Sequence, residues 1–232
     1  MLDSGYKYKP FMRKGQVFNY HDFKPSDLPK DIRFLEDIPY QNRPAVNFSS
    51  IDNQAVMSSM TKVPVCKKIL EHYRAGHSVL VLFTQKEHIN AYYRYLSLYM
   101  PKDKIMLYYG DNKEKTSVLK EKAESREVLV TLATLAKSTE GTNVKSWEVE
   151  FLVSSMKDEK NVEQATGRIR RVKEGKLNPA IVYDVRYSQC YSLSNHYRVR
   201  KEVYESLGYT IKDPKPVISK GRRNTFSRGY VH

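Results

Sequence analysis

The stretch Val79-Leu80-Val81-Leu82-Phe83 places five apolar residues in succession. A short, continuous apolar run of this kind is typical of a strand buried on both faces of a parallel sheet. Gly76, just before it, suits the end of a preceding helix, and Thr84 would lie at the carboxyl end of the strand. Open α/β sheets place ligands at that end. We therefore predict a parallel sheet with Thr84 on its ligand-binding edge.

Further apolar runs repeat this pattern over residues 105–109, 128–131, 148–154 and 180–185. Helical patterns occupy intervals between them, at about 64–76, 86–99, 113–123 and 191–207. Strands that alternate with helices argue for a parallel sheet with helices on both faces and right-handed connections. The predicted fold class is therefore α/β, in three layers. Flavodoxin-like and nucleotide-sugar domains share this alternation, but no glycine-rich fingerprint follows the first strand here.

The chain carries a strong positive charge. Its 232 residues include 40 Lys and Arg against 26 Asp and Glu, a net charge of +14. This imbalance favours an anionic polymer as partner, and the 18 tyrosines offer rings that can stack on bases. The alternative is a basic protein without such a partner, whose rings belong to its core. A hydrophobic share of 40% is enough for one α/β domain plus extra segments.

Cysteine and histidine usage argues against disulfides and structural metal. Cys66 and Cys190 are the only cysteines, which fits a reducing compartment. The histidines show no ligand spacing with cysteine, so we predict no metal site in this chain. No apolar run approaches membrane-spanning length, and no signal-peptide pattern follows Met1. We expect an intracellular, cytoplasmic protein (in the host cytoplasm if it is viral) without a membrane partner.

Composition divides the chain into three parts. Residues 1–60 show no sustained period and are punctuated by prolines, so we expect an irregular extension that acts as a connector. Residues 61–211 hold the predicted α/β domain. Residues 212–232 are basic and contain prolines, which predicts a flexible tail. This tail either adds salt-sensitive phosphate contacts or only improves solubility.

A second decisive stretch is Glu163-Gln164-Ala165-Thr166-Gly167-Arg168-Ile169-Arg170-Arg171. On a helix, Gln164, Arg168 and Arg171 would share one face, because they are spaced by four and three residues. Gly167 leaves room beside Arg168. Two guanidinium groups and an amide suit a triphosphate, because they donate to oxygens on which charge develops during phosphoryl transfer. The alternative is a solvated basic helix face, which is how most charge runs are used.

Two other polar stretches follow predicted strands. Ser138-Thr139-Glu140-Gly141-Thr142-Asn143-Val144 comes after the 128–131 run, and small hydroxyl residues next to a glycine allow a close approach to phosphate. An ordinary polar turn is the alternative. Thr84-Gln85-Lys86-Glu87-His88 follows the first strand, and its first and fourth residues also fit a helix capping box. Thr131 would end another strand at the same edge.

Together, in their order and at about their spacing, these stretches resemble motifs IV, V and VI of superfamily 2 helicases. Gln164-x-x-Gly167-Arg168-x-x-Arg171 carries most of the resemblance. It covers roughly residues 60–210, the second RecA-like lobe of such an enzyme. Within the superfamily, the sequences of residues 138–144 and 197–201 are most similar to those of phage branch-migration helicases of the UvsW kind and their XPB-like relatives.

The resemblance implies roles for individual residues. Arg168 and Arg171 would act as arginine fingers on the γ-phosphate, and Gln164 would position the nucleotide and water. Near the nucleotide it places Gly141, Asn143 and Gly167. On the nucleic-acid strand it places Thr84, Gln85, Thr131, Ser138 and Thr139. Position 143 is often aspartate in the family, so asparagine keeps a hydrogen-bonding group there but not the charge.

The phosphate cradle of such a motor is missing from this sequence. No G-x-x-x-x-G-K-[ST] loop occurs, and no Asp-Glu pair ends an apolar run. We therefore expect ATP and Mg²⁺ to be held mainly by a separate or missing N-terminal lobe, in cis or in trans, and this chain alone to lack ATPase activity. The resemblance favours DNA as the strand. The alternative is a non-catalytic nucleic-acid-binding module derived from half of a helicase.

Overall fold

The computed structural model describes residues 2–3, 48–110, 116–139, 143–171, 174–176, 179–187 and 190–212. Most of the predicted connector and nearly all of the predicted tail lie outside these residues.

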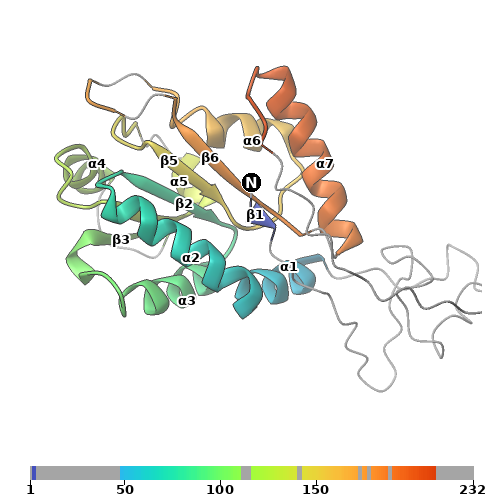
Figure 1. Ribbon diagram of the computed structural model, residues 1–232, viewed down its shortest axis with the longest axis horizontal. Coiled ribbons are helices and arrows are strands. Elements are labelled where there is room, and N and C mark those ends of the chain that lie inside the picture. The colour runs from blue at the N-terminus through green and yellow to red at the C-terminus, as the bar shows by residue number, and fades with distance from the viewer. Residues whose placement is uncertain are drawn as a thin grey trace, which may run out of the picture.

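One parallel sheet forms the centre of the described part of the chain (Figure 1). Its strand order is β1-β6-β5-β2-β4-β3, and every neighbouring pair is parallel. The strands are β1 (Leu2–Asp3), β2 (Val79–Phe83), β3 (Ile105–Tyr108), β4 (Val130–Thr134), β5 (Val149–Leu152) and β6 (Ile181–Arg186). The predicted α/β fold with a parallel sheet is therefore confirmed.

Strand β2 lies at the middle of this sheet, between β4 and β5. All five of its residues are buried, as expected for a strand covered on both faces. Val79 is aligned with Val130 on one side and with Val149 on the other. The carboxyl ends of the three strands therefore meet along one edge.

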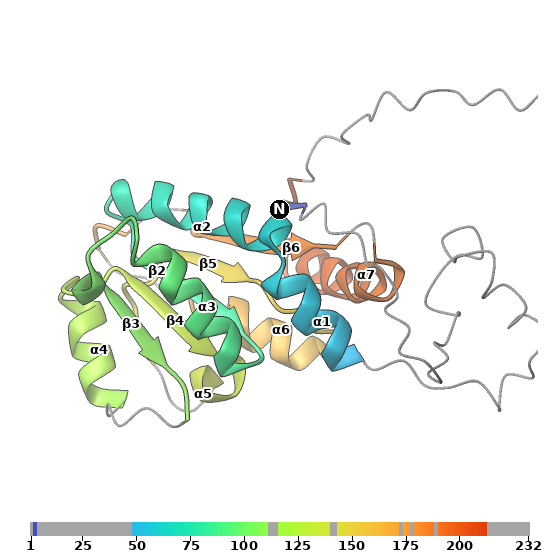
Figure 2. The same cartoon turned by 90° about the horizontal axis from the view of Figure 1, so that it is seen from below.

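Helices cover both faces of the sheet (Figure 2). One apolar cluster packs beneath α1 (Phe48–Met57), α2 (Ser59–Arg74) and α3 (Lys86–Leu96). A second packs beneath α4 (Thr116–Glu124), α5 (Leu135–Thr139) and α6 (Glu159–Thr166). A short 3-10 helix, Lys102–Lys104, precedes β3. The predicted three layers are present.

Helix α7 (Tyr191–Ser206) belongs to both clusters. Leu193 packs into the first, and Val203 and Tyr204 pack into the second. Buried Arg200 fastens the helix to β6, because its Nε and Nη2 each donate to the carboxylate of Asp184 at 2.8 Å. The helix therefore runs along the edge of the sheet and closes both cores.

Helix α1 falls inside the segment predicted as a connector. Ile51, Ala55 and Val56 are almost fully buried and belong to the first apolar cluster, so they are part of the folded domain. Helix α2 also begins earlier than the predicted start at Pro64. Ser58 is its N-cap, and the Ser58 hydroxyl accepts a hydrogen bond from Met60 N–H.

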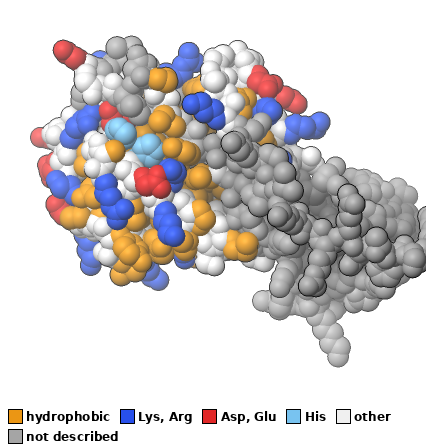
Figure 3. All heavy atoms as spheres, in the orientation of Figure 1, with side chains coloured by type: hydrophobic (Ala, Val, Ile, Leu, Met, Phe, Trp, Pro, Cys, Tyr) orange, Lys and Arg blue, Asp and Glu red, His pale blue; other side chains and the backbone are white. Residues whose placement is uncertain are grey.

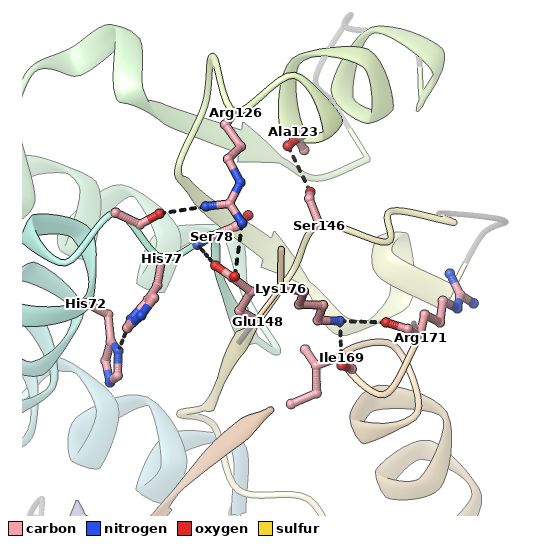
Figure 4. Close-up of polar contacts among 11 residues, drawn as sticks. His72, His77, Ser78, Ala123, Arg126, Ser146, Glu148, Ile169, Arg171 and Lys176 are labelled. Atoms are coloured by element: carbon pink, nitrogen blue, oxygen red, sulfur yellow. Dashed lines mark hydrogen bonds and ion pairs between the residues drawn. The ribbon is translucent and has the colours of Figure 1, made fainter. Parts of the chain in front are cut away.

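A buried acid ties three segments together at the amino end of the sheet (Figure 4). The Ser78 N–H donates to Glu148 Oε2 at 2.7 Å, and Arg126 Nη2 donates to Glu148 Oε1 at 2.9 Å. Arg126 also donates to the Gly76 carbonyl at 3.0 Å. These bonds hold the entries to β2, β4 and β5 together.

The surface over α2 and α3 mixes Lys and Arg side chains with apolar ones (Figure 3). Leu98 and Tyr99 are the most exposed of the large apolar residues described, at 74% and 55%. Within the described ranges, none of the helices has the length and apolar character needed to cross a bilayer.

Candidate functional site

Helix α6 ends immediately before the predicted arginines. Asp158 begins the helix by accepting a hydrogen bond from Asn161 N–H at 2.8 Å, and Gly167 is its C-cap. Arg168 and Arg171 therefore lie in the turns after the helix, and the predicted helical face that they share with Gln164 is wrong. The last turn tightens because Arg168 N–H donates to the Ala165 carbonyl.

Gly167 has a steric reason to be glycine. A Cβ atom at this position would lie 3.0 Å from the Glu163 carbonyl oxygen, closer than side chains normally come. A side chain here would require the backbone to shift, which favours glycine where the chain leaves α6; that Gly167 leaves room beside Arg168 stays a prediction.

Lys176 holds the turn that follows (Figure 4). Its ammonium group donates to the Ile169 carbonyl at 2.6 Å and to the Arg171 carbonyl at 2.9 Å. Carbonyl groups near the end of a helix often lack backbone partners, and a lysine here satisfies two of them. Sequence reasoning missed this contact.

The structure brings Arg171 and Asn143 together. Arg171 Nη1 donates to Asn143 Oδ1 at 2.6 Å. Asn143 is exposed and Arg171 is partly exposed, so the pair lies at the surface. Two of the predicted motifs, which are 28 residues apart in sequence, therefore meet at one point.

Arg168 is oriented differently, because its side chain is only 6% exposed. Its Nε donates to the Gln164 carbonyl at 3.3 Å, and its Nη1 has no hydrogen-bond partner among the described residues. Burial lowers the pKa of Arg168; the charge of Arg171 acts in the same direction, while Glu150 opposes it. A buried guanidinium without a full set of acceptors is costly to the fold.

The acid with the largest electrostatic effect on the Arg168 pKa is Glu150, on β5. Glu150 is fully buried, and neither of its carboxyl oxygens has a hydrogen-bond partner in the described part of the chain. Burial raises the pKa of Glu150 well above its usual range, and Arg168 lowers it only in part. Glu150 and Arg168 are therefore two buried ionisable groups that interact electrostatically and are incompletely hydrogen-bonded, which sequence reasoning missed.

The remaining residues of this group divide into exposed, buried and undescribed ones. The side chain of Gln164 is exposed on α6, and Gly167 is exposed next to it. Ser138 is buried on α5, where its hydroxyl donates to the Leu135 carbonyl at 2.8 Å. Gly141 and the side chain of Thr139 lie outside the described residues.

Thr84 lies at the carboxyl end of β2, as predicted, but it does not form the predicted capping box. The N-cap of α3 is Gln85, which makes no side-chain capping bond. The Thr84 hydroxyl instead lies 3.3 Å from Asp52 Oδ2 and 3.2 Å from Ser154 Oγ. The hydroxyl therefore interacts with these two side chains and not with a backbone N–H in the first turn of α3, and the capping prediction is wrong.

Thr84 belongs to a polar cluster that joins α1, β2, α3 and the end of β5. Asp52 also accepts from Ser155 N–H at 2.8 Å, and Ser154 Oγ lies 3.3 Å from His88 Nδ1. Burial raises the pKa of Asp52 to about 6 and lowers the pKa of His88 to about 4. No sequence signal pointed to these partners, since they come from separate segments and one of them lies in the predicted connector.

The structure corrects the placement of Thr131. Strand β4 runs from Val130 to Thr134, so Thr131 is its second residue rather than its last. Its side chain is 1% exposed. The apolar run ended at Thr131, but pairing with β2 continues to Thr134 opposite Phe83. Thr131 therefore lies away from the edge where Thr84 is found.

The donor groups of this region suit phosphate better than a metal ion. Arg171, Asn143 and Gln164 offer N–H groups at or near the surface. Within the described ranges, no group of three or more His, Cys, Asp or Glu side chains gathers as metal ligands would. The arrangement can bind an anion from one side and requires other groups to complete a site.

The fold is similar to that of T4 UvsW. The two structures share 15% sequence identity with a TM-score of 0.55, over 76% of this chain and 37% of that chain. The protein thus spans little more than a third of the length of T4 UvsW. No protein-family model matches the sequence, and no curated protein matches it either.

Two further solved structures are less similar. The C-terminal part of the Fun30 ATPase domain has a TM-score of 0.48 and 13% identity, over 69% of this chain and 49% of that chain. The DUF1998 helicase MrfA bound to DNA and AMPPNP has a TM-score of 0.49 and 14% identity, over 61% and 20%. The predicted three-layer RecA-like fold is confirmed by the sheet and by the likeness to T4 UvsW, whereas the assignment to a second helicase lobe and to the branch-migration group stays a prediction.

Proposed function

We propose that the chain is the C-terminal lobe of an ATP-dependent superfamily 2 helicase or translocase that acts on nucleic acid, with DNA as the preferred strand. A first lobe, in the same or another polypeptide, would supply the phosphate-binding loop and the magnesium ligands. One observation carries the proposal: the Arg171–Asn143 hydrogen bond joins two predicted motifs at the surface. The likeness in fold to T4 UvsW supports it.

In this proposal ATP lies between the two lobes, and the bound Mg²⁺ neutralises charge on its phosphates. Closure of the lobes brings Arg171 to the γ-phosphate, where its guanidinium donates to oxygens that gain negative charge. Asn143 holds the arginine in place until then. Arg168 is the second finger, and because it is buried now, it must turn outward as the lobes close. Gln164, exposed on α6, positions the nucleotide and the attacking water.

The strand is proposed to bind at the carboxyl edge of the sheet. Thr84 is exposed and Gln85 is partly exposed there, and the cluster around Asp52 fixes the orientation of Thr84. Helix α5, which carries Ser138 and Thr139, follows β4 at the same edge. Alternate closing and opening of the lobes would then move the protein along the strand.

The test is nucleic-acid-stimulated ATPase activity with a first lobe present, supplied in trans or fused upstream. We expect Arg171→Ala and Arg168→Ala each to lower turnover by about 10³-fold, the smaller of the effects known for arginine fingers. Arg198→Ala, which removes an exposed arginine from α7, is the matched control and should leave turnover unchanged. Full turnover in both finger variants, with normal melting curves, would disprove the assignment.

One observation favours a second function. Arg168 is buried and interacts with Glu150, which is how an arginine with a structural role is placed. If it cannot turn outward, the chain is a non-catalytic nucleic-acid-binding module. That function predicts no ATPase activity with any first lobe, but salt-dependent binding of nucleic acid by this chain alone.

A further inference from the structure

A hollow beside the turn after α6 shares only Arg171 with the function proposed above. Its volume is about 860 Å³, within the range of sites for small ligands. Strand β6, the turn around Arg170 and the residues that follow α7 form its walls. The described lining is rich in tyrosine and in basic side chains, and two of these, Arg170 and Lys212, are exposed.

One aromatic ring is held firmly in the wall. The Tyr209 hydroxyl donates to the Thr166 carbonyl at 3.3 Å, and the ring packs edge-on against Tyr204 with 5.8 Å between centroids. The guanidinium of Arg170 lies over the Tyr209 ring, 5.6 Å from its centroid. A planar cation beside a fixed ring offers a stacking surface for a base and a donor for phosphate.

The charge of the hollow favours an anion. Its described lining contains the basic residues Arg170, Arg171, Lys176 and Lys212 and one acid, Asp184. That acid is already neutralised, because its carboxylate accepts from Arg200 and from the Tyr204 hydroxyl. A ligand that carries both an aromatic ring and a phosphate matches the ring, the cations and the volume together.

We propose that this hollow binds a nucleotide unit, with its base against Arg170 and Tyr209 and its phosphate near Arg170 and Lys212. The unit is either a free nucleotide or one nucleotide of a single strand, since both present the same ring and phosphate. The inference goes beyond the proposed function, which uses a different site between two lobes. It needs neither a first lobe nor the action of Arg168 or Arg171 on ATP, so either can fail without the other.

The test uses this chain alone, with a fluorescent short oligothymidylate and with thymidine monophosphate as ligands. Arg170→Gln removes the exposed guanidinium, and Tyr209→Leu removes the ring but keeps apolar volume. We expect each to weaken oligothymidylate binding about tenfold, the size of effect that loss of one stacked base produces. Arg94→Gln, on α3 at the opposite face, removes the same charge and should change affinity less than about twofold.

The outcomes separate the two sources of ligand. If thymidine monophosphate also binds and depends on the same two residues, the ligand is a free nucleotide; if only the oligothymidylate does, it is a strand. Equal weakening by Arg170→Gln and Arg94→Gln would show that only net charge matters and would overturn the proposal. Failure of both ligands to bind would overturn it as well. Arg170 is exposed, so its variant decides the matter even if Tyr209→Leu fails to fold.

Discussion

Glu148 and Glu150 are separated by one residue and both are buried, yet they differ in their hydrogen bonding. Glu148 accepts hydrogen bonds from the Ser78 N–H and from Arg126. Neither oxygen of Glu150 has such a partner in the described part of the chain, and burial raises its pKa well above the usual range. The first acid is satisfied at the amino end of the sheet, and the second lies unsatisfied beneath the candidate site.

The difference separates a structural acid from one that costs stability. Buried polar groups are nearly always hydrogen-bonded, so an exception calls for an explanation. Glu150 acts on Arg168, whose Nη1 also lacks a partner among the described residues. Strongly perturbed groups of this kind gather at functional sites. We infer that Glu150 serves to interact with Arg168, whereas Glu148 stabilises the fold through its hydrogen bonds.

Glu148→Gln should destabilise the protein more than any other substitution considered for these two acids. An amide provides one acceptor where the carboxylate provides two, and it removes the charge opposite Arg126. We expect the free energy of unfolding, measured in urea, to fall by about 2–3 kcal/mol, as for loss of charged hydrogen bonds. Glu121→Gln, on the exposed face of α4, should change it by less than about 0.5 kcal/mol. Equal effects of the two variants would contradict a structural role for Glu148.

Glu150→Gln should have a smaller effect that depends on pH. The folded-state pKa of Glu150 is raised, so the folded protein holds this proton while the unfolded chain releases it above its ordinary pKa of 4.5. Wild-type stability from this group therefore falls as pH rises from 4.5 through the raised value. The variant lacks that loss, and we expect its unfolding free energy to match the wild type near pH 4.5 and to exceed it increasingly at higher pH. A constant difference across pH would show that Glu150 is ionised in the fold.

Arg168→Met should have the smallest effect on stability. Methionine keeps much of the apolar stem and removes a buried guanidinium whose Nη1 is unpaired. Replacing a poorly satisfied buried charge by an apolar side chain is often neutral or stabilising, so we expect a change within about 1 kcal/mol of wild type by thermal unfolding. A loss as large as that of Glu148→Gln would mean that Arg168 is structural, and would favour the non-catalytic function.

The central strands were predictable because they are continuous apolar runs. Val79 to Phe83 became β2 without change of bounds, and its parallel neighbours followed from the alternation with helices. The buried acid in β5 was not predictable. The run 148–154 predicted a strand buried on both faces, but nothing in the sequence indicated how an acid such as Glu150 would be accommodated there. Only the packing of α6 and α7 over one face of the sheet buries the carboxyl group.

Part of the candidate site was predictable from residue types and their order in the sequence. The resemblance placed Asn143 and Arg171 near one nucleotide, and the structure brings these two side chains together, whereas the phosphate site itself stays a prediction. The helical spacing of the arginines did not hold, because α6 ends at Thr166 and the Arg168 N–H then bonds to the Ala165 carbonyl, three residues back. The capping prediction at Thr84 failed because its true partner, Asp52, is 32 residues away in sequence. Contacts of that range leave no local signal.

The position of helix α7 affects how the protein unfolds. Because one element supplies Leu193 to the first apolar cluster and Tyr204 to the second, neither layer can lose it and keep a closed interior. Denaturation should therefore be all-or-none rather than stepwise. Anyone trimming the protein to a smaller fragment must retain the chain through Ser206, since removal of that helix would expose both sides of the sheet at once.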